Sequence, residues 1–183
     1  MWTGVTGDAA AARDLFAALL AVEERVHGAE HPLTLRTRGW LADNTGEAGD
    51  PAAARDQLAV LVPVSEQILG ADHPDTLGLR GALAHWTGEA GDPAGARDQL
   101  AALLPLIEQI HGPKYPRILR GRRDLARWTG EAGDPASARD QLAALLPVIE
   151  RVLGPEHPDT SAARHELSLW TGIADGSPST CAN

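Results

Sequence analysis

The sequence predicts an all-α fold, a right-handed α-solenoid built of helix-turn-helix repeats. The first observation is a fixed period of 42 residues, a length typical of stacked supersecondary units. The second is that residues 86–112 and 128–154 are identical at 22 of 27 positions. The third is that Ala and Leu supply most of the apolar residues, which favours packed helices. The period is marked by Trp2, Asn44, Trp86, Trp128 and Trp170, each of which opens a phrase similar to WTGEAGDP.

The first helix of a period is predicted to run from Pro74 to about Ala90. Its apolar face carries Leu79, Leu83, Trp86 and Ala90, which follow at intervals of four, three and four residues. His73 is the expected N-cap, and Pro74 suits the first helical position, where no backbone N–H is needed. Gly91 provides the flexible backbone that ends a helix.

The second helix of a period is predicted to begin with Asp92 as N-cap and Pro93 as its first residue. It ends at Gly112. The residues expected to be buried are Ala96, Leu100, Leu103, Ile107 and Ile110. Since one hairpin cannot bury both of its faces, the repeats must stack on one another.

The organisation that follows is a repeat array over residues 1–173 and a polar C-terminal tail over residues 174–183. The periods are 2–43, 44–85, 86–127 and 128–169, with a partial period at 170–173. About eight helices are expected. Because residue 2 falls inside a repeat, we expect a fragment of a larger protein or a truncated one.

Composition excludes several classes of function. The formal charge of −9 argues against binding to nucleic acid or to anionic membranes. Cys181 is the single cysteine, so no disulfide framework or cysteine metal site is expected. No apolar run approaches a membrane span and no signal peptide is visible. We therefore expect a cytoplasmic protein, and the bias toward Ala, Gly and Arg is typical of a bacterial one.

No arrangement typical of catalysis is present, so we expect no enzymatic activity and no cofactor. The TGEAGD phrase lacks the G-K-[ST] of a phosphate-binding loop and ends a helix instead of opening one. His31, His73 and His157 recur with the period, which predicts helix caps instead of metal ligands. His27 and His31 form H-x3-H without a third ligand nearby in the sequence, so no metal site is expected.

Several of these residues resemble the tetratricopeptide repeat. Leu83-Ala84, followed by Gly91-Asp92 and Ala96, is similar to its pattern of small residues at helix crossings. The period and the linkers LGADHPDT and LGPEHPDT resemble the longer kinesin-light-chain type, as found in actinobacterial proteins, often behind a signalling NTPase domain. The resemblance covers residues 2–173. It departs from the family pattern where Leu replaces the aromatic residues usual in the second helix.

The resemblance implies that first helices line a concave groove which binds a protein or peptide. The residues assigned to this groove are Arg36, Asp43, His85, Glu89, Arg120, Arg123, Arg127, Glu131 and His165. Their spacing of three or four residues places each set on one helix face.

The third period is the only one with a positive formal charge, +2 over residues 86–127. Its first helix contains the stretch KYPRILRGRRDLARW. Arg120, Arg123 and Arg127 fall on the predicted groove face, and guanidinium groups match carboxylates bidentately. We therefore expect an anion-binding patch for an acidic peptide or a C-terminal carboxylate. The alternatives are an ordinary solvated charge run, or internal pairing with Asp124 and Glu131.

The function predicted from these observations is a non-enzymatic protein- or peptide-binding module. One alternative is a structural scaffold that self-associates through uncapped solenoid ends, which carry Leu15, Phe16 and Leu19 at one end and Leu167 and Trp170 at the other. Another is a sensor fragment of a larger signalling NTPase.

Trp40, which is out of phase with the repeated tryptophans, is expected in the core.

Overall fold

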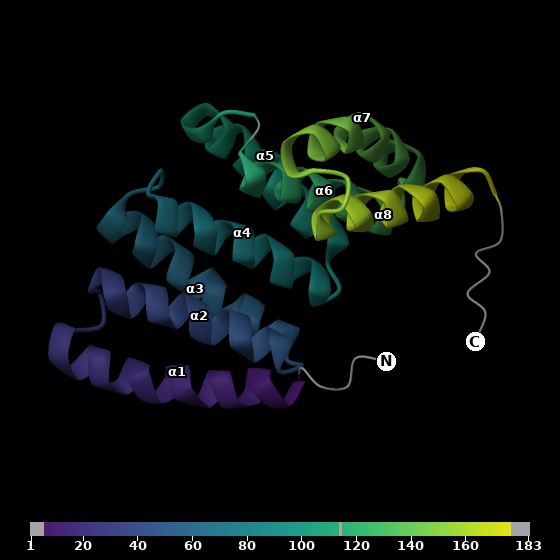
Figure 1. The fold of residues 1–183 in the computed structure, drawn as a ribbon. Helices are drawn as coiled ribbons and strands as arrows, with labels where there is room; N and C mark the ends of the chain where they lie inside the picture. Colours follow the sequence, from purple (N-terminus) through teal and green to yellow (C-terminus); the bar gives the residue numbers. More distant parts are fainter. Residues whose placement is uncertain (1–5, 114, 177–183) are drawn as a thin grey trace. The chain divides into compact units, whose positions relative to one another are not determined.

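The computed structural model describes residues 6–113 and 115–176 (Figure 1). Their regular structure is helical throughout, which confirms the all-α solenoid. The helices are α1 (Thr6–His27), α2 (Pro32–Glu47), α3 (Pro51–Leu69), α4 (Pro74–Glu89), α5 (Pro93–His111), α6 (Pro116–Glu131), α7 (Pro135–Leu153) and α8 (Pro158–Ala174). Trp2, Lys114 and Cys181 lie outside the described residues. None of the helices in the described part is long and apolar enough to cross a bilayer.

The helix boundaries follow from the predicted caps. His31, His73 and His157 are N-caps, and each Nδ1 accepts the backbone N–H two residues later, at 3.3, 3.2 and 3.1 Å. Asp50, Asp92 and Asp134 cap α3, α5 and α7 through their Oδ1 atoms. Each of these helices begins with proline. Gly91 has a φ of +95°, which only glycine adopts readily, and it ends the turn after α4 as expected.

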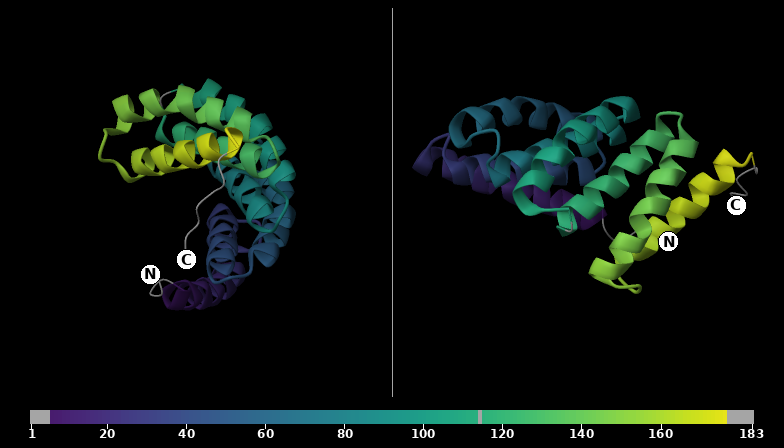
Figure 2. Two further views of the ribbon diagram at one scale, coloured as in Figure 1. Left: turned by 90° about the vertical axis from the view of Figure 1, so that its right-hand side faces the viewer. Right: turned by 90° about the horizontal axis from the view of Figure 1, so that it is seen from above.

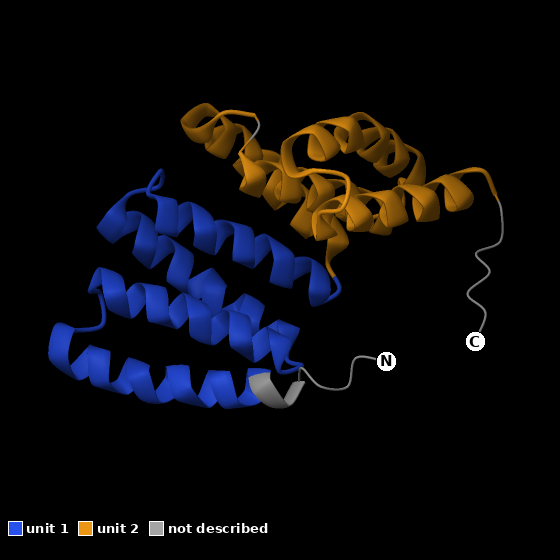
Figure 3. Ribbon diagram, in the orientation of Figure 1, with its two compact units in different colours: residues 1–91 blue, residues 92–183 orange. Residues whose placement is uncertain are grey.

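The chain divides into two compact units, Met1–Gly91 and Asp92–Asn183, each containing four helices in its described part (Figure 3). Within a unit, consecutive helices pack side by side (Figure 2). The first helices of neighbouring repeats also contact each other, α2 with α4 and α6 with α8. One face of each unit is therefore lined by first helices, as the resemblance implied.

The repeated tryptophans form the contacts between repeats. In the first unit the Trp86 ring lies directly against Gly46, and in the second the Trp170 ring lies against Gly130. Both tryptophans are buried, with 7% of their surface exposed. In both units, the tryptophan of one repeat thus packs against the glycine that ends the corresponding Asn-Thr-Gly or Trp-Thr-Gly phrase of the preceding repeat.

Two burial predictions are wrong. Ile110 is 48% exposed, and Leu104, six residues earlier, is buried instead. Trp40 is 42% exposed because it lies one residue beyond the buried Gly39; its ring packs against Phe16, 5.6 Å between centroids. Trp170 is buried with Ala126, Ala138 and Leu142, as the repeated tryptophan position predicts, so it does not contribute to an exposed apolar end.

Candidate functional site

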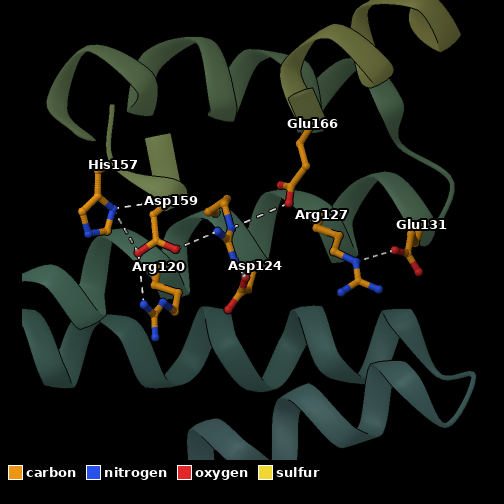
Figure 4. Close-up of polar contacts among 8 residues, drawn as sticks. Arg120, Asp124, Arg127, Glu131, His157, Asp159 and Glu166 are labelled. Carbon is orange, nitrogen blue, oxygen red and sulfur yellow. Dashed lines mark hydrogen bonds and ion pairs between the residues drawn. The ribbon is translucent and has the colours of Figure 1, made fainter. Parts of the chain in front are cut away.

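In the second unit, α6 packs against α8, and Arg123 of α6 is the centre of an ion-pair cluster. Figure 4 shows its partners Asp159 and Glu166 on α8 and Asp124 on α6. Arg123 Nη1 donates to Asp159 Oδ1 at 3.2 Å, and its Nη2 donates to Asp124 Oδ1 at 3.1 Å. Its Nε lies 3.7 Å from Glu166 Oε1. Only 16% of the Arg123 side chain is exposed, so this guanidinium joins α6 to α8 more than it faces solvent.

Arg120 occupies the outer edge of the same cluster. Its Nη2 donates to Asp159 Oδ2 at 3.1 Å, yet 61% of its side chain is exposed. A guanidinium carries several donors in a rigid fork, so a single bond to Asp159 leaves others directed to solvent. Arg120 is therefore the most accessible of the three arginines assigned to the groove.

Arg127 lies one turn beyond Arg123 on α6. Its Nε donates to Glu131 Oε1 at 2.8 Å, and its guanidinium carbon lies 4.2 Å from the centroid of the Trp128 ring. The second contact is a cation–π interaction, which favours a flat guanidinium over an aromatic face. The internal pairing with Asp124 and Glu131, the alternative left open by the sequence, is present in the structure.

The two carboxyl groups from α8 have opposite pKa shifts. Burial alone would raise the pKa of Asp159, but the Arg120 hydrogen bond and the charges of Arg120, Arg123 and His157 leave it below its ordinary value. Burial raises the pKa of Glu166 above its ordinary value, and the nearby Arg123 charge offsets this only in part. Asp159 is therefore the established anionic partner of the arginines, whereas the charged form of Glu166 is disfavoured.

A recurring pair that the sequence analysis missed accounts for another arginine of α6. Arg122 donates to Glu108 Oε2 at 2.6 Å, joining the end of α5 to α6. The same pairing, between residues 14 positions apart, occurs in every repeat: Glu24–Arg38, Glu66–Arg80, Glu108–Arg122 and Glu150–Arg164. Its recurrence at the period was the signal that would have revealed it. Arg122 therefore belongs to the scaffold and adds little to the charge of the patch.

The remaining predicted residues fall into two groups. In the first unit, Asp43 accepts a hydrogen bond from Trp86 Nε1 at 2.8 Å, and the His85 ring lies 4.7 Å from the Trp86 ring. Arg36 stacks over Trp40 at 5.1 Å from its centroid. These three residues thus contact aromatic side chains of the scaffold. Glu89, Glu131 and His165 are exposed, and so is Arg36.

The comparisons with known proteins agree with the fold. The family model of the tetratricopeptide repeat matches residues 34–75 and 119–159. A comparison with curated protein sequences finds no match.

Two solved structures contain the nearly identical TPR-like repeats of a Podosopora anserina protein assigned to the kinesin light chains, one of them a substituted variant. Each is 24% identical to this chain, and the alignment covers 94% of this chain and 81% of theirs, with TM-scores of 0.77 and 0.76. BtubC (BKLC) of P. vanneervenii is 16% identical, with 93% of this chain and 68% of its own covered and a TM-score of 0.77. At these identities the likeness shows a shared fold.

Proposed function

Because residues 34–75 and 119–159 match the tetratricopeptide repeat model and the solved neighbours share the fold, we propose that the chain is a tetratricopeptide repeat array and a non-enzymatic module that binds a protein or peptide partner through its first helices. The fold supports an interaction module in general. The finer proposal is that the face formed by α6 and α8 receives an acidic peptide. In this proposal Arg120 anchors a carboxylate of the partner, and Arg123 is a positioning residue.

The observation that carries this proposal is the contrast between Arg120 and Arg123. Arg123 is mostly buried and bonded to Asp159 and Asp124, so it holds the cluster together. Arg120 is bonded to the same Asp159 but is 61% exposed. Because Asp159 is already shared with Arg123, Arg120 can turn its outer donors to a second carboxylate without leaving a buried charge alone.

The test is to select peptides from a random displayed library on the intact chain and measure their affinity for wild type and Arg120→Glu. We expect the selected peptides to be rich in Asp and Glu. An exposed pair contributes up to about 1 kcal/mol, so the charge reversal should weaken binding by about fivefold or more. The affinity should also fall with added salt, which screens exposed charges.

The matched control is Arg97→Glu, which reverses an arginine on the second helix α5 that pairs with Asp98. Circular dichroism checks that both variants keep their helices. The proposal is overturned if the library yields no acidic binders, or if Arg120→Glu and Arg97→Glu have the same effect on affinity.

We propose self-association as a second candidate function, supported by a different observation. On α1, the side chains of Leu15, Leu19, Val22 and Val26 are 71%, 42%, 45% and 65% exposed. Their spacing of four, three and four residues places them on one helix face. An exposed apolar face of this kind favours contact with another protein surface, including that of a second copy. Sedimentation velocity over a range of concentrations tests this function.

A further inference from the structure

The repeat position occupied by Asp43 has a defined structural role in the first unit. Asp43 Oδ1 accepts a hydrogen bond from the indole Nε1–H of Trp86, which stands 43 residues later in the sequence. Trp86 is 7% exposed, so its N–H requires a partner inside the protein. At this position a carboxylate completes the packing of the following repeat.

In the second unit the same position holds Arg127, and the corresponding indole belongs to Trp170. The packing around the ring is the same, since Trp170 lies against Gly130 as Trp86 lies against Gly46. By repeat equivalence, residue 127 is the counterpart of Asp43, as Trp170 is the counterpart of Trp86. A guanidinium has only donors, however, and cannot accept the indole hydrogen.

The consequence is an unsatisfied donor. Trp170 is more than nine-tenths buried. Within the described part of the chain, its Nε1 is buried and has no hydrogen-bond partner. The Arg127 guanidinium contacts Glu131 and the Trp128 ring. A buried N–H without an acceptor is unfavourable, so a group that supplies an acceptor there gains more than an ordinary surface hydrogen bond.

We propose that Trp170 Nε1 and the Arg127 guanidinium form a subsite for a carboxylate of the binding partner. One carboxylate oxygen accepts the indole hydrogen of Trp170, and the other faces Arg127. The ligand thus supplies the group that Asp43 supplies in the first unit. This inference deepens the proposed function, on which it rests for the source of the carboxylate.

The surroundings favour a singly charged carboxylate over a phosphate. Asp43 shows that a carboxylate fits against the tryptophan in this packing. The group that pairs with Arg127 is the carboxylate of Glu131, 2.8 Å from its Nε. This acidic neighbour would repel a dianion more strongly than a monoanion. The Arg127 side chain is 34% exposed, so a carboxylate can approach its guanidinium from solvent.

The test follows the indole N–H resonances of the ¹⁵N-labelled intact chain by NMR. Trp170 is assigned by the resonance that disappears in Trp170→Phe. The probes are acetate, a short peptide with an internal Asp and an amidated C-terminus, and a neutral peptide of the same length with a free C-terminal carboxylate. A fully amidated peptide with Asn in place of Asp is the negative control.

We expect the Trp170 resonance to move with at least one carboxylate probe, while the Trp86 resonance stays in place because Asp43 already binds that indole. A response to the Asp peptide alone identifies a side-chain carboxylate as the ligand, and a response to the free terminus alone identifies a C-terminal one. Arg127→Leu, which places here the residue found at position 169, should weaken the response by about tenfold through loss of the charge.

Arg127→Asp is the second variant, because it restores the arrangement of the first unit. Its Trp170 resonance should move without ligand and should then ignore every carboxylate probe. The subsite is overturned if the wild-type Trp170 resonance responds to no carboxylate, or if Arg127→Leu responds as strongly as wild type. Acidic peptides that depend on Arg120 but leave the Trp170 resonance unmoved would refute the subsite alone. If acetate moves the Trp170 resonance but no selected peptide depends on Arg120, the subsite stands and the proposed Arg120 anchor is refuted.

Discussion

At the scale of single residues, the glycine of the Trp-Thr-Gly phrase determines how closely two repeats approach. A Cβ added at Gly130 would lie 2.6 Å from the Trp170 ring, a distance that side chains do not tolerate. Gly46 has the same relation to Trp86. Gly172 occupies the equivalent position in α8, yet a Cβ there would meet no atom within 4 Å. Two chemically identical substitutions should therefore have opposite effects.

We predict that Gly130→Ala lowers the free energy of unfolding by about 1–3 kcal/mol, because the methyl group pushes the Trp170 ring out of its packing. Gly172→Ala should raise it by about 0.5–1 kcal/mol, because alanine loses less backbone entropy in a helix interior than glycine does. Urea denaturation followed by circular dichroism measures both. Equal effects of the two variants would contradict the packing seen here.

At the scale of helices, charged side chains join elements in two ways. The Glu–Arg pairs at 14-residue separation tie each second helix to the first helix that follows it. The cluster around Arg123 instead ties α6 to α8, two first helices in neighbouring repeats. Its two acidic residues from α8 should respond differently to pH, because the pKa of Asp159 is lowered and that of Glu166 is raised.

We predict that Asp159→Asn is less stable than wild type at neutral pH. The pKa of Asp159 in the folded chain lies below its ordinary value of 3.8, so its charged form adds stability above that pH and loses it as the pH falls through the lowered pKa. The difference between variant and wild type should therefore shrink in acid. Thermal unfolding at a series of pH values measures it, and a difference that grows in acid would contradict the prediction.

The prediction for Glu166→Gln has the opposite sign. The pKa of Glu166 in the folded chain lies above 4.5, so its contribution is fully present below that pH and is lost as the pH rises through the raised pKa. Glutamine stays uncharged, and this variant should be at least as stable as wild type at neutral pH and should match it in acid. Ser168→Ala is the control, because Ser168 is an uncharged, exposed residue of the same helix α8. A large loss of stability at neutral pH in Glu166→Gln alone would show that its pairing with Arg123 outweighs its burial.

At the scale of the whole molecule, the first and last described helices differ from the repeats between them. On α8, Ser161 and Ser168 are exposed where the other first helices bury Leu35, Leu77 and Leu119, and Ala42, Ala84 and Ala126. This face of α8 is therefore polar where the other first helices are apolar. On α1, by contrast, the exposed Leu15 replaces the glutamine found at 57, 99 and 141. Self-association is therefore expected through α1 and not through α8.

We predict that the wild-type chain self-associates with rising concentration and that Leu15→Gln weakens this association. The substitution restores the residue of the other repeats and removes an apolar side chain that is 71% exposed. Val60→Gln is the matched control, because Val60 is 70% exposed on the second helix α3. Sedimentation velocity measures all three proteins. A wild type that stays monomeric, or equal effects of the two variants, would contradict the prediction.

The sequence by itself determined the helices and their order. The 42-residue period, the His and Asp caps and the prolines that follow them act between near neighbours in the chain, so His73, Pro74 and Gly91 predicted the bounds of α4 closely. The same local pattern predicted which residue types face the core, with errors at Ile110 and Trp40. Trp40 is exposed because it lies one residue beyond the buried Gly39, whereas Leu104 is buried because it packs against Gly121 of the neighbouring α6.

Tertiary structure alone decided the chemistry of the arginine-rich face. Counting charges along the sequence placed Arg120, Arg123 and Arg127 on one stripe, but Asp159 and Glu166 come from another repeat, 32 to 46 residues away from these arginines. Ion pairing depends on distance in space, so only the packing of α8 on α6 shows that Arg123 is neutralised and that Arg120 remains exposed. Likewise, the Trp170 indole lacks an acceptor where Arg127 stands in place of the carboxylate of Asp43. The hydrogen bond between Asp43 and Trp86, which only the structure shows, reveals this difference.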